Sequence, residues 1–146
     1  MRAVAVLASV SALVAGLVTI AYLLTAAGPI TLCSLLPPLR CIAAQLSGVQ
    51  YFTGDSQAAP VWHVTFNVVV PLFALGASLL HLRRRFAGAL VLAALASVPF
   101  SVVLFGTYFV VPFQFVIVGA VLVTFIAVSL GTTRAVWAPE SDATSA

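Results

Sequence analysis

Two long runs without a charged side chain constrain this chain more than any other feature. The first extends from Ala3 to Leu39 and the second from Phe86 to Thr133. As one helix rising ~1.5 Å per residue, the second run would be roughly 70 Å long, more than twice the ~30 Å hydrocarbon core of a bilayer. It must therefore fold back, and the sequence predicts a protein that crosses the membrane several times.

Charged residues make up only 6% of the chain, against about 25% in soluble domains. The first apolar run is longer than the roughly 7–15 residues of a signal-peptide core, so we expect a retained span rather than a cleaved leader. Gly106-Thr107 is the expected break in the second run. We predict an all-α fold, a single four-helix membrane bundle over residues 1–133, with spans at 4–27, 61–82, 86–105 and 108–130.

The basic residues predict the orientation of the bundle. All six are arginines, and five of them flank apolar segments: Arg2, Arg83, Arg84, Arg85 and Arg134. This is the pattern of topology signals rather than of a nucleic-acid-binding face, and it places those arginines in the cytoplasm. Both termini and the polar tail 134–146 are then cytoplasmic, the loop 28–60 faces outward, and a prokaryotic plasma membrane is the expected location.

Both cysteines, Cys33 and Cys41, lie in the predicted outward loop, with Pro37-Pro38 between them. The outer side of a membrane is oxidising, which favours a disulfide. The pair could be a structural staple or a redox centre that exchanges electrons with a thiol partner, and the spacing alone favours the staple. A C-x-x-C motif is absent, and a zinc site would need more ligands than His63 could add, so neither thioredoxin-type chemistry nor a metal is expected.

The L-C-x7-C pattern at Leu32-Cys33 and Cys41, in an outward loop after the first of four spans, resembles the vitamin K epoxide reductase family. The Gly54-Asp55-Ser56 turn before the second span and the short final hairpin also have counterparts there. The resemblance implies a membrane thiol–disulfide oxidoreductase with Cys33 and Cys41 as catalytic residues, a quinone as electron acceptor and an extracytoplasmic thioredoxin-like thiol protein as partner.

The chain departs from that family at the second cysteine pair. Family members carry a C-x-x-C near the outer end of the fourth helix, whereas this chain has Tyr108-Phe109-Val110-Val111-Pro112 there. Without a thiolate at that position, direct attack on a quinone from it is excluded. The resemblance therefore implies either an unusual active member or a degenerate one.

Polar side chains inside the spans are candidates for a quinone site. Asn67 and Gln114 are expected roughly 9 Å inside the outer boundary of the membrane. An amide, imidazole or phenol could donate to the quinone carbonyls within apolar walls. Hydrogen bonds between helices explain such residues equally well. The five candidates at this level are Tyr22, His63, Asn67, Ser101 and Gln114.

Other functional classes find little support in the sequence. His63 and His81 are some 27 Å apart along one helix and have no partner histidines, so haem is not expected. The three carboxylates, Asp55, Glu140 and Asp142, lie outside the spans, which argues against a proton-coupled transporter. Two hypotheses remain: a quinone-linked oxidoreductase, and a non-catalytic accessory subunit of a larger, for example respiratory, membrane complex.

Overall fold

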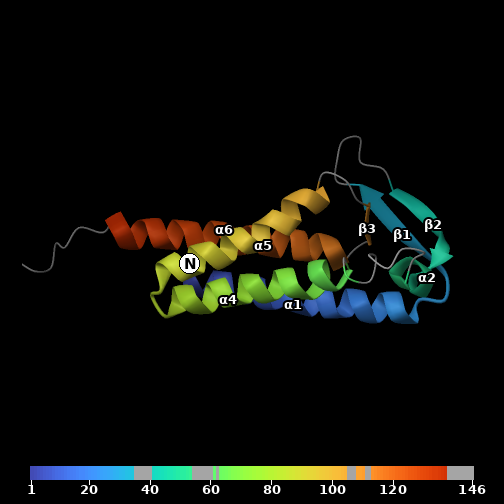
Figure 1. Cartoon of the computed structure of the whole chain (residues 1–146), viewed down its shortest axis with the longest axis horizontal. Coiled ribbons are helices and arrows are strands. Elements are labelled where there is room, and N and C mark those ends of the chain that lie inside the picture. The colour runs from blue at the N-terminus through green and yellow to red at the C-terminus, as the bar shows by residue number, and fades with distance from the viewer. Residues whose placement is uncertain (35–40, 54–60, 62, 105–107, 111–112, 138–146) are drawn as a thin grey trace, which may run out of the picture.

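The computed structural model describes residues 1–34, 41–53, 61, 63–104, 108–110 and 113–137. Most of these residues are helical, and the long helices run alongside one another (Figure 1). The helices are α1 (Arg2–Thr25), α2 (Gly48–Thr53), the π-helix η1 (Thr65–Val69), α4 (Val70–Leu82), α5 (Phe86–Leu104) and α6 (Phe113–Trp137). The strands are β1 (Pro29–Ser34), β2 (Cys41–Ser47) and β3 (Tyr108–Val110).

Three of the described helical segments are long and apolar enough to cross a membrane. They are Arg2–Thr25, Thr65–Leu82 and Phe113–Trp137, and α5 adds a shorter apolar stretch, Phe86–Val98. Leu7, Val14 and Leu17 on α1 are each more than half exposed. Such apolar surface is costly in water and suits a lipid environment, so the structure is consistent with a membrane protein.

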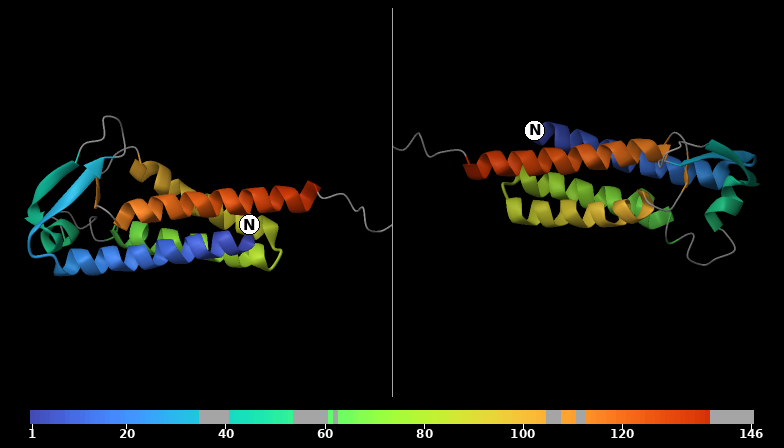
Figure 2. Two further views of the ribbon diagram at one scale, coloured as in Figure 1. Left: turned by 180° about the vertical axis from the view of Figure 1, so that it is seen from behind. Right: turned by 90° about the horizontal axis from the view of Figure 1, so that it is seen from above.

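Small side chains line the contacts between the long helices. Ala12, Ala15 and Gly16 on α1 are buried, as are Ala74 and Ala77 on α4. Two clusters rich in buried alanine lie between the helices. Figure 2 shows the close approach of these helices from two further sides. Small residues let helix backbones approach closely, which matters in lipid, where apolarity alone does not drive association.

The chain is not all-α, because β1 and β2 of the predicted outward loop join β3 in a three-stranded antiparallel sheet with the order β2-β1-β3. The fourth predicted helix also differs: residues 108–110 form β3, and α6 begins only at Phe113. Tyr108–Val110 leaves the helix because it pairs with Leu32–Ser34 of β1. At its other end α6 continues to Trp137, so Arg134 belongs to a helix rather than to a tail, and residues 138–146 lie outside the described part.

The sheet is attached to the end of α1 by α2 and a small apolar cluster. Ser47 and Gln50 form a capping box at the start of α2, in which the Ser47 backbone amide donates to Gln50 Oε1 at 2.8 Å and the Gln50 amide donates to Ser47 Oγ at 3.3 Å. The Gly48 amide donates to the Ala26 carbonyl at 3.0 Å. The apolar cluster consists of Tyr22, Leu23, Ala26, Ile30, Leu32, Tyr51 and Phe52.

At the opposite end, the turn Arg83–Arg85 joins α4 to α5. The Arg84 amide donates to the His81 carbonyl at 3.2 Å, and the Arg85 amide donates to the Leu80 carbonyl at 2.9 Å. This is the Schellman pattern of helix termination, and Arg84 occupies its left-handed position with φ 58°. The N-terminus and the C-terminal end of α6 lie at this same end (Figures 1 and 2).

Candidate functional site

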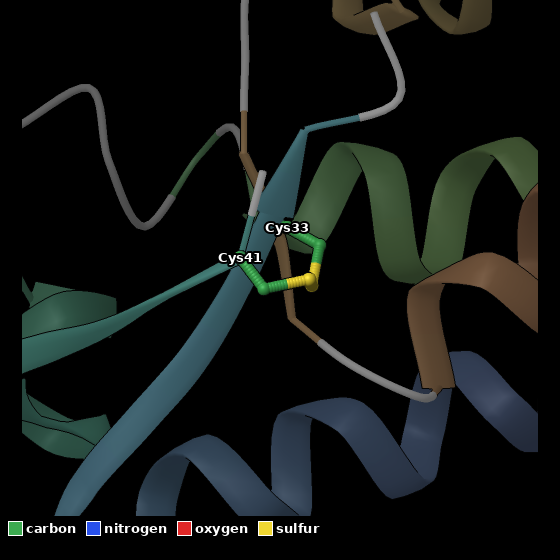
Figure 3. Close-up of a disulfide and its surroundings, with 2 residues drawn as sticks. All are labelled: Cys33 and Cys41. Atoms are coloured by element: carbon green, nitrogen blue, oxygen red, sulfur yellow. A yellow bond between two sulfur atoms is a disulfide. The ribbon is translucent and has the colours of Figure 1, made fainter. Parts of the chain in front are cut away.

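The two cysteines form a disulfide between neighbouring strands of the sheet (Figure 3). Cys33 of β1 and Cys41 of β2 are direct partners in the antiparallel register, with their Cα atoms 4.1 Å apart. Cys33 is only 3% exposed, whereas Cys41 is exposed. Cys41 is therefore the more accessible residue of the pair.

Strand β3 lies on the other side of β1 from Cys41. Phe109 is the register partner of Cys33 on this side. Residues 108–110 belong to the segment where the expected resemblance to the vitamin K epoxide reductase family would place a second cysteine pair. The fold thus brings this segment directly beside Cys33, but with Tyr, Phe and Val in place of a thiol. Val111 and Pro112 lie outside the described residues.

Inside the bundle, Asn67 and Gln114 meet. Gln114 Nε2 donates to Asn67 Oδ1 at 3.1 Å, and both side chains are buried. The Asn67 Nδ2 group in turn donates to the His63 carbonyl at 2.8 Å. The sequence allows two explanations for these amides, a quinone site and hydrogen bonds between helices. The contact between Asn67 and Gln114 is of the second kind.

A local irregularity of the helix accompanies Asn67. Pro71 has no N–H and cannot donate to the Asn67 carbonyl four residues earlier, and the helix widens here into the π-helix η1, with the Val70 amide bonded to the Thr65 carbonyl. A Cβ atom on Gly16 of α1 would collide with the Asn67 carbonyl oxygen. Glycine at position 16 therefore allows α1 to approach the backbone of η1 directly.

The ring of His63 turns towards α2. Its centroid lies 4.9 Å from that of Tyr51 and 5.5 Å from that of Phe52, with the Phe52 ring stacked on it. His63 lies just before the span Thr65–Leu82. Burial lowers its pKa, and a hydrogen bond to the Tyr51 backbone partly offsets this effect, so the ring is mostly neutral at pH 7. Burial also raises the pKa of the Tyr51 phenol.

The remaining two candidates do not join the amide pair through a described hydrogen bond. Tyr22 packs against Phe113, the neighbour of Gln114, with ring centroids 5.8 Å apart. Ser101 lies in α5, but its side chain is outside the described residues. The structure thus brings together Asn67 and Gln114, directs the His63 ring to α2 and leaves Tyr22 in an aromatic contact. A quinone head group would have to compete with these contacts for its donors.

Sequence reasoning missed the sheet, the π-helix and the close approach at Gly16. Pro71 was a usable signal for the π-helix, because a proline within a helix removes one hydrogen bond. Among the described residues, no three His, Cys, Asp or Glu side chains gather into a group that could hold a metal.

Comparison with known proteins leaves the chain without an assigned family: no family model, curated protein or solved structure matches it.

Proposed function

We propose that this chain is a multi-pass protein of the cell membrane with four spans and cytoplasmic termini, and that it serves as a non-catalytic subunit of a larger membrane complex. The observation that carries the proposal is the buried hydrogen bond between Gln114 and Asn67 at 3.1 Å. This contact gives two of the five polar residues at the expected quinone level a role in helix packing.

The outward sheet supplies the contact surface in this proposal. Strand β2 is at the edge of the described sheet, in the order β2-β1-β3. Edge strands present backbone groups to which a partner can add a strand. Ile42, next to Cys41 on β2, is 47% exposed and offers an apolar contact at this edge. The disulfide then braces the edge strand against β1.

A second candidate is the quinone-linked thiol–disulfide oxidoreductase implied by the family resemblance. The observation that favours it is the unequal exposure of the cysteines, with Cys41 exposed and Cys33 buried. A thiolate of a thioredoxin-like partner would attack Cys41 Sγ, form a mixed disulfide with it and release Cys33 as a thiolate. The partner's second thiolate would then attack the partner's own sulfur in the mixed disulfide, so that the partner leaves as a disulfide and Cys33 and Cys41 are both reduced. A quinone would later take up two electrons and two protons as the disulfide re-formed, but Phe109 rather than a second thiol lies beside Cys33.

One experiment separates the two candidates. Purified, fully reduced protein is mixed anaerobically with a short-chain quinone, and quinol and free thiols are followed together, with a Cys33→Ala/Cys41→Ala variant as the control. The subunit proposal expects no more quinol from the native chain than from this variant. One quinol formed per disulfide would overturn it in favour of the oxidoreductase.

A second measurement tests assembly. In mild detergent extracts of the native membrane, native mass analysis is expected to show a complex of fixed stoichiometry. The Ile42→Glu substitution should reduce the complex by at least about tenfold and leave the thermal stability of the purified chain unchanged, because Ile42 is exposed. A monomer that carries a bound quinone would contradict the proposal.

A further inference from the structure

The end of the bundle opposite the sheet has an open cavity of about 470 Å³. This volume is within the roughly 300–1,000 Å³ of typical ligand pockets. Helices α1, α4 and α6 meet here, close to the N-terminus marked in Figures 1 and 2. The cavity is lined by Met1, Arg2, Ala3, His81, Gly131 and Arg134.

The charged side chains of the lining are basic, and no carboxylate among the described residues pairs with them. Arg2 comes from the first turn of α1 and Arg134 from the last turn of α6. None of the described residues is an aspartate or glutamate, since the three in the chain are Asp55, Glu140 and Asp142. Two guanidinium groups that face one cavity repel each other unless an anion lies between them.

His81 adds an independent observation. Its side chain is only 1% exposed, and its Nδ1 atom is buried without a hydrogen-bond partner. Buried polar atoms in native structures are nearly always satisfied, so the unpartnered Nδ1 atom has room in its hydrogen bonding for a water molecule or a bound ligand. An imidazole N–H at this position could donate to an anionic oxygen.

The surroundings of His81 hold its ring at the cavity. The Phe86 ring lies 5.4 Å from it, centroid to centroid. A Cβ atom on Gly131 would collide with His81 Nε2. Glycine at position 131 thus leaves space in α6 for the imidazole, and this space would be lost with any other residue.

We propose that this cavity is a binding site for a phosphate group, held by Arg2, Arg134 and His81. Guanidinium groups bind phosphate through paired, charge-assisted hydrogen bonds, which are stronger than neutral ones. The phosphate belongs either to an anionic lipid headgroup or to a soluble phosphate compound. Both sources have the same chemistry at the site, which is independent of the role proposed for the outward sheet.

The test is thermal unfolding of the full chain in neutral detergent with two probes. One probe is phosphatidylglycerol in mixed micelles, compared with phosphatidylcholine at the same concentration. The other is inorganic phosphate, compared with chloride at the same ionic strength. Stabilisation by phosphatidylglycerol alone identifies a lipid site, and stabilisation by inorganic phosphate identifies a site open to soluble anions. Stabilisation by neither probe overturns the proposal.

Substitutions distinguish a defined site from general attraction to a positive surface. Arg134→Gln and Arg2→Gln are each expected to weaken the apparent affinity for the stabilising probe about tenfold, through loss of charge-assisted hydrogen bonds. Arg85→Gln is the matched control, because Arg85 is exposed at the same end but does not line the cavity. An equal loss of affinity in all three variants would show that the probe responds only to the positive surface, and would overturn the proposal.

His81→Gln tests the third member of the site. It is expected to weaken binding by a similar factor, and the unfolding temperature without a probe reports whether the fold is kept. If this variant unfolds, the two arginine variants decide the outcome, since Arg2 and Arg134 are exposed and their replacement leaves the packing intact. Unchanged binding in both arginine variants would contradict the site.

Discussion

Gly16 shows how a single residue sets the distance between two helices. The position that a Cβ atom would take is already occupied by the Asn67 carbonyl oxygen, and the neighbouring backbone atoms of Asn67 are also close. Backbone cannot rotate away as a flexible side chain can. The close approach of α1 and η1 therefore depends on glycine, which has only a hydrogen atom where every other residue has a Cβ atom.

We expect Gly16→Ala to lower the free energy of unfolding by about 1–3 kcal/mol, the usual effect of overpacking a tight contact. Unfolding in mixed micelles of neutral and denaturing detergent measures this change. Gly119→Ala on α6 is the matched control, because a Cβ atom there meets no other atom within 4 Å. This control should be neutral or slightly stabilising. Equal destabilisation by both substitutions would show that the effect comes from replacing any helix glycine, and would contradict the role given to the close contact at Gly16.

At the residue scale, the sequence gives the position of a residue along its helix but not the direction of its side chain. Asn67 and Gln114 were placed at the same depth from their distance to the helix ends, and they lie in contact. Whether they would face each other or a ligand depends on how each helix is rotated about its axis. The π-helix at Thr65–Val69 changes that rotation, and the spacing of residues does not reveal it.

At the scale of secondary-structure elements, the disulfide stabilises the hairpin formed by β1 and β2. It joins register partners, Cys33 and Cys41, across the two strands. An isolated two-stranded hairpin is marginally stable in water. By restricting the unfolded loop, a cross-link between residues this close in sequence contributes about 2.5 kcal/mol in the chain-entropy account.

Reduction of the disulfide is therefore expected to destabilise the sheet locally and to leave the helices folded. Hydrogen exchange of oxidised and reduced protein measures this: the amides of β1 and β2 should lose protection by about 2.5 kcal/mol, while those at the centre of α1 and α6 keep theirs. Cys33→Ala/Cys41→Ala should behave like the reduced chain, and Ala43→Ser on the exposed side of β2 should behave like the oxidised one. Loss of protection throughout the bundle would show that the disulfide supports the whole fold.

The elements themselves were predictable to different degrees. Long apolar runs predict membrane helices directly. Three of the predicted spans overlap segments that are long and apolar enough to cross a membrane. The sheet was missed because its strands are short and one of them, Tyr108–Val110, pairs with a strand distant in sequence. Such pairing depends on how the spans are arranged and not on local periodicity.

For the whole molecule, the orientation in the membrane is the main property inferred from charge. The arginine-rich turn, the N-terminus and the end of α6 lie together, and the sheet lies at the opposite end (Figures 1 and 2). In the topology proposed above, which follows the positive-inside rule, the turn would be cytoplasmic and the sheet would lie outside. Arg84 in this turn has a left-handed backbone conformation, which glycine would adopt at lower cost.

Cysteine labelling tests this orientation. In the oxidised chain the native cysteines are paired, so a membrane-impermeant maleimide should react only with an introduced cysteine. Gln50→Cys, at an exposed position of α2, should be labelled on intact cells, and Ala87→Cys, beside the arginine turn, only after permeabilisation. The unsubstituted chain is the control for background reaction. The reverse pattern would invert the topology and move the sheet to the cytoplasm.

The order of the strands also has a consequence for how the molecule is made. Strands β1 and β2 emerge early in synthesis, whereas β3 follows only after α4 and α5. The hairpin can therefore pair, and its cysteines can oxidise, while the second half of the chain is still entering the membrane. Until β3 arrives, one edge of β1 stays open. If the chain inserts with the proposed topology, closing that edge would follow the insertion of α5, because β3 lies between α5 and α6 in the sequence.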